Sequence, residues 1–275
     1  MLVPFPVPWD FELTTERFRA FGADPANVWE DGRLHRVLAG IELAIGPSPG
    51  GVEIEPADEA LVPHVRRFLG AAFDLDALGR FAVSDPVLAR LVAELRGLRP
   101  TLVPDPWEML VGSVTAQQVS LHAATAIRAR LVRTYGERRE RAWAFPARER
   151  VAALAPDDLL GLGFSRAKAR YVVELARSDV DLEALATLPD EEVKRAITSL
   201  VGFGEWSADW FLARHLGRPQ AWPAGDLGLR KAVGAFYVGG RDPSISETRA
   251  LGERFGEHRN VVAHYLLVGL RVLGR

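Results

Sequence analysis

The chain has 275 residues, of which 48% are hydrophobic and 25% charged, with a net charge of −2 and no cysteine. This length suffices for one large or two ordinary domains with a buried core. The lack of cysteine excludes disulfides, a thiolate nucleophile, a cysteine-ligated zinc and an iron–sulfur cluster. No signal-like or membrane-spanning apolar run occurs, so we expect a cytoplasmic protein with no membrane partner. The charge argues against coating nucleic acid by bulk electrostatics but allows a local basic face.

Residues 1–100 predict a small N-terminal domain that contains both strands and helices. Hydrophobic residues alternate over 41–45, a Gly/Pro/Ser turn follows, and the alternation resumes at 52–54. This pattern is typical of a β-hairpin. Residues 11–13 are compatible with another strand, and a short helix is expected over about 14–21.

From Asp58 onward the hydrophobic period is helical, and residues 101–275 predict an α-helical body. The arginine-rich stretch 128–150 is interpreted as a solvated helix end. The expected helices cover about 58–70, 85–96, 106–135, 149–154, 165–177, 190–199, 205–216, 226–235 and 246–272, the last as one helix or two.

The helix that begins after Asp105 has a well-defined start. Asp105 suits the capping position, a proline follows, and Glu108 completes a capping box. Leu110, Val114 and Gln117 fall on one stripe, so an amide lies on the inward face. One interpretation is that the helix breaks at Gln117 and offers polar groups to a cavity. The other is that Gln117 forms a hydrogen bond to a neighbouring loop. Helical spacing alone favours the second interpretation.

Two segments, 159–169 and 200–210, read as helix, Gly-x-Gly turn and helix. In the second, Asp190 is expected to cap the entering helix, while Gly202 and Gly204 permit positive φ. Such a turn exposes backbone amides at a helix N-terminus, where a DNA phosphate can bind without lysine. Glycine-capped helical hairpins without a ligand have the same pattern.

Downstream of the second hairpin, a Pro/Gly-rich loop leads to Asp226, 20 residues after Trp206. With "DPWEMLVGSVTAQQVS", "GLGFSRAKARYVVELA", "LVGFGEWSA" and "PAGDLGLRKAV" in this order, the chain resembles the helix-hairpin-helix DNA glycosylases. Within that superfamily it is most similar to the 3-methyladenine DNA glycosylase II branch. The resemblance implies a mainly α fold with a small α+β N-terminal domain, and a helix-hairpin-helix at about 190–216.

The resemblance places the catalytic aspartate of the family at Asp226. A carboxylate near C1′ stabilises the positive charge that develops on the sugar as an N-glycosidic bond breaks. By its position alone, Asp226 is more typical of a helix cap than of a catalytic residue. Asp209, the competing aspartate, is expected to be an exposed surface charge.

Trp206 stands where the bifunctional members of the superfamily have a Schiff-base lysine, so a monofunctional enzyme is expected. A tryptophan at the pocket mouth can stack on a flipped base and attract a cationic alkylpurine. Trp210, one turn later, would form a second wall. Core packing is the alternative interpretation for both side chains.

Other site residues follow from the same resemblance. Gln117 would contact the base, and Gln118 would enter the gap left by the flipped nucleotide. Leu267 stands where the family has a tryptophan, which leaves the lesion preference open. The hairpin residues implied in DNA contact are Gly202, Phe203, Gly204 and Ser207. A structural Na⁺ or K⁺ would be held by the main-chain carbonyls of Thr198, Leu200 and Phe203.

The sequence thus predicts a monofunctional glycosylase that flips an alkylated purine out of double-stranded DNA and hydrolyses its glycosidic bond with Asp226. No cofactor is expected for catalysis, and we expect a monomer associated with the nucleoid. A glycosylase for deaminated or mismatched bases is one alternative. A non-catalytic helix-hairpin-helix module that binds DNA is the other.

Overall fold

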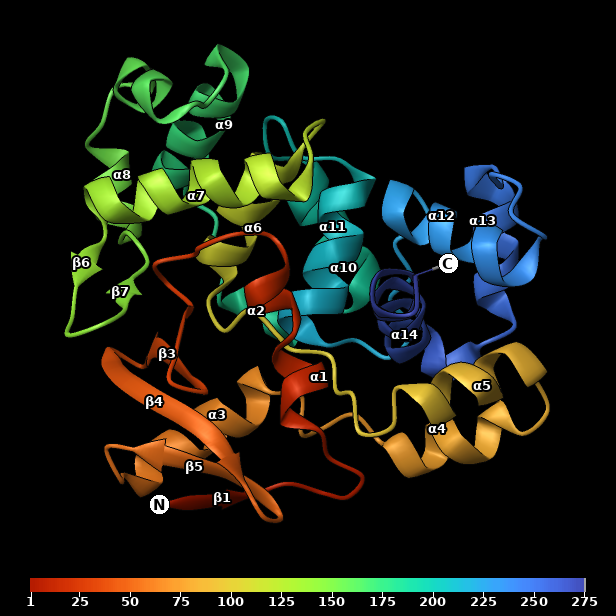
Figure 1. Ribbon diagram of the computed structural model, residues 1–275. Coiled ribbons are helices and arrows are strands. Elements are labelled where there is room, and N and C mark those ends of the chain that lie inside the picture. The colour runs from red at the N-terminus through yellow and green to blue at the C-terminus, as the bar shows by residue number, and fades with distance from the viewer. Residues whose placement is uncertain (275) are drawn as a thin grey trace.

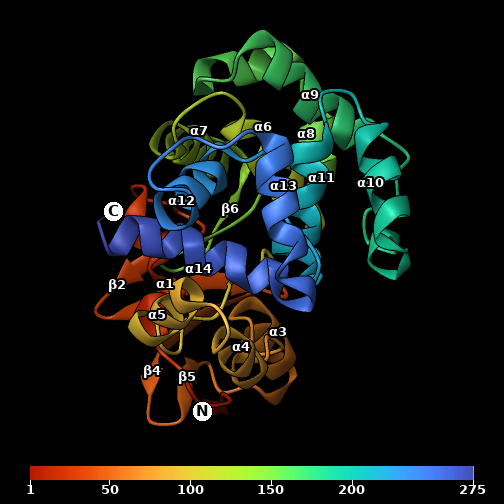
Figure 2. The ribbon, with the colours of Figure 1, turned by 90° about the vertical axis from the view of Figure 1, so that its right-hand side faces the viewer.

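A computed structural model of the protein describes residues 1–274 (Figure 1). A small antiparallel sheet lies at the N-terminal end, and helices make up the rest of the molecule. In Figures 1 and 2 the sheet and α3 to α5 occupy the lower part, and most of the other helices lie above them. The mainly α fold with a small N-terminal sheet is therefore confirmed.

The sheet has five strands in the order β1-β5-β4-β3-β2, and neighbouring strands are antiparallel. The predicted hairpin is confirmed as β4 and β5, in which Ile45 lies opposite Ile54. Both side chains are buried because alternate residues face the same core. The strands are β1 (Leu2–Pro4), β2 (Val28–Glu30), β3 (Arg33–Leu38), β4 (Ile41–Ser48) and β5 (Gly51–Glu55), with a separate ribbon of β6 (Glu137–Arg138) and β7 (Trp143–Ala144).

The strand expected over 11–13 is wrong, because this segment is helical. The Asp10 carboxylate accepts a hydrogen bond from the Leu13 amide at 2.8 Å and so begins α1. A helix that the sequence pattern missed, α4, begins in the same way after Asp74. The helices up to residue 94 are α1 (Phe11–Thr15), α2 (Arg17–Ala20), α3 (Val62–Phe68), α4 (Leu75–Ala82) and α5 (Pro86–Glu94).

Most of the remaining helices agree with the expected ranges within a few residues, although the segments expected over 106–135 and 246–272 each form two helices. They are α6 (Pro106–Ala116), α7 (Leu121–Tyr135), α8 (Arg148–Ala152), α9 (Arg166–Arg177), α10 (Asp190–Thr198), α11 (Glu205–Phe211), α12 (Leu227–Tyr237), α13 (Ile245–Glu253) and α14 (Arg259–Val272). Short turns are η1 (Glu59–Leu61), η2 (Pro156–Leu162), η3 (Ala184–Thr187) and η5 (Gly256–His258), and η4 (Leu212–Leu216) is a π-helical turn.

The single helix expected over 106–135 is two helices. Gln117 leaves the helical region with ψ 125°, and Gln118 has φ 54°. The Ser120 hydroxyl then caps α7 by accepting from the Ala123 amide at 3.2 Å. The long segment at the C-terminus is also divided, as α13 and α14. The expected Asp190 cap is wrong, because Pro189 holds that position and Asp190 lies in the first turn.

Three hydrophobic clusters form the interior. One lies under the sheet, and one fills the body around α6, α9, α10 and α11. The third joins residues 75–98 to residues 222–268. Figure 2 shows α14 running across the molecule above α4 and α5. In this way α14 connects α4 and α5 to the other C-terminal helices.

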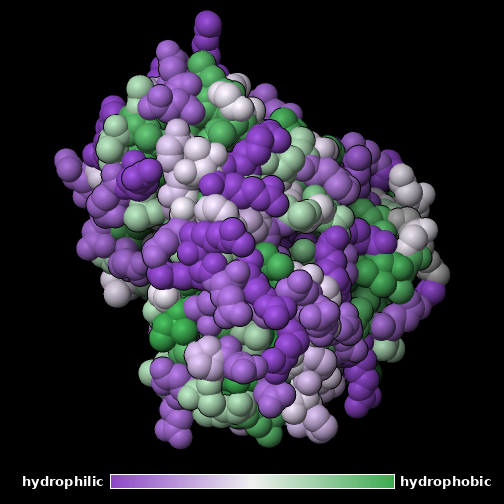
Figure 3. Space-filling view, turned by 60° about the vertical axis from the view of Figure 1, so that its left-hand side comes forward, coloured by the Kyte–Doolittle hydropathy of each residue, from purple (hydrophilic) through white to green (hydrophobic). Residues whose placement is uncertain are grey.

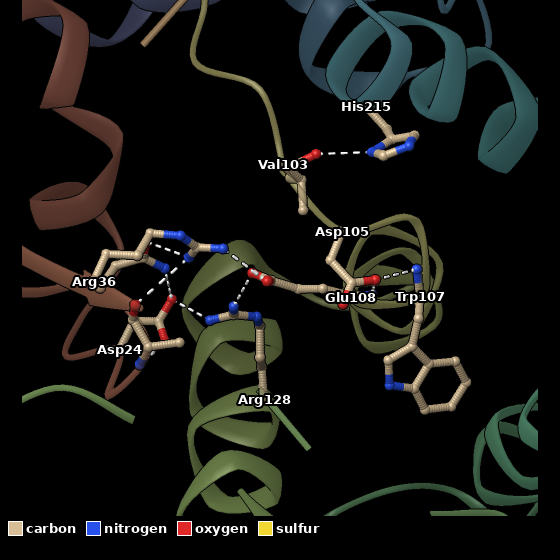
Figure 4. Close-up of polar contacts among 10 residues, drawn as sticks. Asp24, Arg36, Val103, Asp105, Trp107, Glu108, Arg128 and His215 are labelled. Carbon is tan, nitrogen blue, oxygen red and sulfur yellow. Dashed lines mark hydrogen bonds and ion pairs between the residues drawn. The ribbon is translucent and has the colours of Figure 1, made fainter. Parts of the chain in front are cut away.

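A buried ionic network joins the sheet to α6 and α7 (Figure 4). Glu108 accepts hydrogen bonds from Arg36 at 2.7 Å and from Arg128 at 2.6 Å. Arg128 also pairs with Asp24. Arg128 is thus an interior residue, which corrects the expectation that the whole arginine-rich stretch is solvated.

One face of the molecule is largely polar. On the face in Figure 3, hydrophilic residues form a band across the middle, and the hydrophobic patches are separate. Several exposed arginines of the 128–150 segment pair with acidic neighbours, among them Arg139 with Glu137 and Arg141 with Glu30. These pairs limit the net basic charge of the 128–150 segment.

Glu108→Gln is expected to lower the free energy of unfolding by about 3 kcal/mol, since two buried guanidinium groups lose their shared carboxylate. The control Glu137→Gln removes an exposed partner and should cost less than about 1 kcal/mol. Urea denaturation followed by circular dichroism measures both, and equal losses would contradict a dominant role for the buried network.

Candidate functional site

A cavity of about 1270 Å³ lies between the N-terminal helices, the α6–α7 junction, the hairpin before α11, and the helices α12 and α14. Residues far apart in the sequence meet at its wall. The predicted site residues that line it are Gln117, Gln118, Gly202, Gly204, Trp206, Ser207, Trp210 and Asp226, together with Leu267. Phe203, in contrast, is a buried core residue.

Asp226 is both a helix cap and a pocket residue. Its Oδ1 accepts from the Leu229 amide at 2.9 Å, which begins α12. Its Oδ2 accepts from the indole N–H of Trp206 at 2.9 Å and of Trp210 at 3.0 Å. Three N–H donors thus fix the carboxylate and stabilise its negative charge.

The two tryptophans hold this aspartate, a role that the sequence did not reveal. They lie four residues apart on α11, so both indoles project to the same side. Trp210 is 5% exposed and belongs to the core, whereas Trp206 is half-buried. The four-residue spacing predicts that the two indoles share a helix face, but it does not indicate which acceptor their N–H groups contact.

The hairpin between α10 and α11 is held by Gly202. Gly202 has φ 87°, and a Cβ there would lie 2.2 Å from ring carbons of Tyr171. The Gln117 amide donates to the Gly202 carbonyl at 2.9 Å, so Gln117 bonds to a neighbouring loop at a point where its helix also breaks. Gly204 has φ −126° and does not use the conformational freedom expected of it.

Gly202→Ala should destabilise the protein by about 2 kcal/mol or more, because it combines a left-handed backbone with a clash against Tyr171. Gly204→Ala is the matched control, since nothing lies within 4 Å of a Cβ at that position. It should cost about 1 kcal/mol or less. Thermal denaturation checks both, and a Gly202 variant as stable as the control would contradict the packing argument.

Two other predicted residues have distinct surroundings. Ser207 is buried, and its hydroxyl lies 3.5 Å from that of Ser113. Gln118 is exposed at the pocket rim beside Val119, in the left-handed conformation imposed by the helix break. The rim therefore presents a polar and an apolar side chain to whatever covers the cavity.

The expectation that Asp209 is an exposed charge is wrong. Its side chain is buried, 3.3 Å from Lys194 on α10. Burial raises the pKa of Asp209 to about 6, although Lys194 opposes this shift. The spacing to Arg214 suggested a surface position, but packing of α11 against α10 places the residue inside.

Because the folded-state pKa of Asp209 is above the unfolded value, the folded state binds more protons between about pH 4 and 6. Wild-type stability therefore falls through this window as pH rises. Asp209→Asn does not titrate, so its stability relative to wild type should increase by about 2 kcal/mol from pH 4 to pH 7. The free energies of unfolding of wild type and Asp209→Asn, measured across this pH range, test this prediction. A difference between the two proteins that does not change with pH would contradict the raised pKa of Asp209.

Three pocket residues escaped the sequence analysis. Arg17 comes from α2, Arg214 from the π-helical turn η4, and His264 from α14. Burial and the nearby Arg214 lower the pKa of His264 to about 3, so this imidazole is neutral. The local sequence around Arg17 carries no site pattern, and only the fold brings it to the cavity.

Together, the glycine hairpin and the carboxylate-bearing pocket define a helix-hairpin-helix protein with a recessed site. A family model for HhH-GPD superfamily base excision DNA repair proteins matches residues 111–258, and the chain belongs to this family. Among residues 1–274, no helix is both long and apolar enough to cross a membrane.

Relatives and solved structures agree with this assignment. The chain is 27% identical over 216 residues to DNA-3-methyladenine glycosylase from Bacillus subtilis, covering 76% of this chain and 71% of the relative. It is 31% identical over 147 residues to DNA-3-methyladenine glycosylase 2 from Escherichia coli, covering 52% of this chain and 50% of that one. The structure of a 3-methyladenine DNA-glycosylase from Archaeoglobus fulgidus matches with a TM-score of 0.90 and 28% identity, covering 99% and 98%.

Proposed function

We propose that the protein is a monofunctional DNA glycosylase that excises alkylated purines of the 3-methyladenine type during base excision repair. The observation that carries this proposal is Asp226, a carboxylate held by three N–H donors at the wall of a recessed pocket. Family membership and the similarity to 3-methyladenine glycosylases support it. Trp206 cannot form a Schiff base, which favours hydrolysis without strand cleavage.

In the proposed reaction the C1′–N bond breaks and its electron pair leaves with the base. Positive charge develops on the sugar, and the Asp226 carboxylate stabilises it. A water oxygen then bonds to C1′ and releases a proton, and an abasic site remains. Trp206 and Trp210 keep the carboxylate oriented so that it need not reorganise during bond cleavage.

The partner is double-stranded DNA with a damaged base. Because the cavity is recessed, the target nucleotide must flip out of the duplex to reach Asp226. The exposed Gln118 at the rim suits the gap that flipping leaves. Among residues 1–274, the amides of Glu205 and Trp206 donate no loop or turn hydrogen bond, so the start of α11 can bind a phosphate.

A monovalent cation at the hairpin is part of the proposal. The Leu200 carbonyl accepts from the Phe203 amide at 3.2 Å. Within residues 1–274, no loop or turn amide donates to the carbonyls of Thr198 or Phe203. This oxygen set suits Na⁺ or K⁺, whose charge would favour a DNA phosphate beside the turn, while base cleavage would need no metal.

Asp226→Asn should lower base release by at least about a hundredfold, because the charge that stabilises the transition state is lost. Purified protein is incubated without added metal with duplexes carrying 3-methyladenine or 7-methylguanine. Released base and strand breaks are scored separately, and strand breaks are expected only after alkali treatment.

The control Asp242→Asn removes an exposed carboxylate that does not line the cavity, and it should leave base release unchanged. DNA affinity of Asp226→Asn should match wild type in a gel-shift titration. Parallel loss of affinity and excision would assign Asp226 a structural role. Wild-type DNA binding without release of either base would contradict the proposal and favour other lesions or a non-catalytic module.

A further inference from the structure

The first Gly-x-Gly hairpin, residues 159–169, contains a buried amine that the proposed reaction does not use. Lys168 lies in the first turn of α9, where the Ser165 hydroxyl caps the helix and accepts from the Lys168 amide at 3.3 Å. Lys168 is only 9% exposed, and burial lowers its pKa. Among residues 1–274 it forms no ion pair, since the ion pairs of lysine there belong to Lys194. A buried amine without a counter-ion is costly, which indicates that its hydrogen bond has a specific role.

Lys168 donates this hydrogen bond to the end of α6. Its Nζ lies 3.0 Å from the carbonyl oxygen of Thr115, in the last turn of α6. A helix leaves its last carbonyls without intrahelical donors and has partial negative charge at this end, so an ammonium group suits the position. Lys168 therefore fixes the end of α6 from a position 53 residues further along the chain.

The helix end held by Lys168 leads directly into a strained residue. Gln118 has φ 54°, in the left-handed region. Among residues 1–274, the other positive φ angles outside glycine belong to Asp31 and Ala39, and each of these precedes a glycine in a two-residue turn between strands. Gln118 is not part of such a turn. A strained conformation of this kind persists only where the surrounding contacts hold it.

Two contacts hold the chain just before the strained residue. Lys168 holds the Thr115 carbonyl, and the Gln117 amide donates to the Gly202 carbonyl at 2.9 Å. Tyr171 lies one turn after Lys168 on α9, and its ring packs against Gly202. Helix α9 thus contacts both the α6–α7 junction and the hairpin before α11, and it sets the position of one relative to the other.

We propose that Lys168 is a positioning residue that holds Gln118 at the cavity rim, where Gln118 fills the gap that a flipped nucleotide leaves in the duplex. This inference rests on the proposed glycosylase function and adds to it a residue that does not line the cavity. Lys168 acts through the Thr115 carbonyl and touches neither the base nor the sugar. Because it orders the α6–α7 junction before DNA binds, less conformational entropy is lost on binding.

This role predicts a dependence on base pairing. When a paired nucleotide flips out, it leaves a gap in the duplex, and a side chain that fills the gap stabilises the flipped state. A nucleotide in a single-nucleotide bulge has no opposite base, so its extrusion leaves no such gap. Loss of the Lys168 contact should therefore slow the release of a paired lesion much more than the release of a bulged one.

The test measures single-turnover release of 7-methylguanine from a duplex with the lesion opposite cytosine and from a duplex with the lesion in a single-nucleotide bulge. Lys168→Met should lower the rate on the paired duplex about tenfold, the size of one lost charge-assisted hydrogen bond. The rate on the bulged duplex should stay within about twofold of wild type. Lys168→Arg, which keeps a cationic donor, should recover most of the rate on the paired duplex.

Arg177→Met is the matched control on the same helix. Arg177 is exposed and donates to the carbonyls of Ala152 at 2.9 Å and Leu154 at 2.7 Å, at the other end of α9. The variant loses comparable contacts without disturbing the α6–α7 junction. It should therefore leave the ratio of the two rates unchanged.

A second measurement follows base flipping without cleavage. The fluorescence of 2-aminopurine placed at the target position rises when the base leaves the stack. On binding to a fully paired duplex, Lys168→Met should give a smaller rise than wild type or Arg177→Met at saturating protein. An equal rise in all three proteins would overturn the inference.

The rate measurements can also overturn it. Equal losses on both duplexes in folded Lys168→Met would assign Lys168 a purely structural role, and unchanged rates on both would exclude any role. If Lys168→Met does not fold, Lys168→Gln, which is neutral and one atom shorter, replaces it with the same expected ratio. Wild-type release from neither duplex would be a failure of the proposed function itself, and the fluorescence measurement would still test the role of Lys168.

Discussion

The Asp226 carboxylate, held by two indoles and one backbone amide, is the contact on which the site depends. It joins α11 to the start of α12 across the Pro/Gly-rich loop. Each partner has a fixed position for a separate reason: the indoles belong to one helix face, and the amide belongs to the first turn that the carboxylate caps. The side chain proposed for catalysis thus also positions the helix that carries it.

The N-terminal third completes the pocket. The Glu108 network ties the sheet to α6 and α7, and α2 brings Arg17 to the cavity wall. A buried pair of arginines around one carboxylate requires close packing, because each charge would be costly without its partner. The N-terminal segment therefore contributes to the chemistry of a cavity whose aspartate lies 209 residues further along the chain than Arg17.

Local charge in this protein differs from its overall charge. The chain has a net charge of −2, yet the cavity wall is basic. Exposed arginines elsewhere are balanced by acidic neighbours, as in the pair of Arg141 and Glu30. Because surface charges are screened and buried ones much less so, charges at the cavity wall act on a bound group more strongly than these exposed pairs do.

The sequence by itself determined the features that arise from short-range patterns. The β4–β5 hairpin, the Asp105 cap and the glycine turn at 202 depend on alternation, capping and backbone freedom, which neighbouring residues define. The order of motifs along the chain also indicated the family. Tertiary structure alone decided that Asp209 is buried, that the tryptophans donate to Asp226, and that Arg17 reaches the cavity. These contacts depend on how distant helices pack, and no local spacing specifies which side chain a neighbouring helix will present.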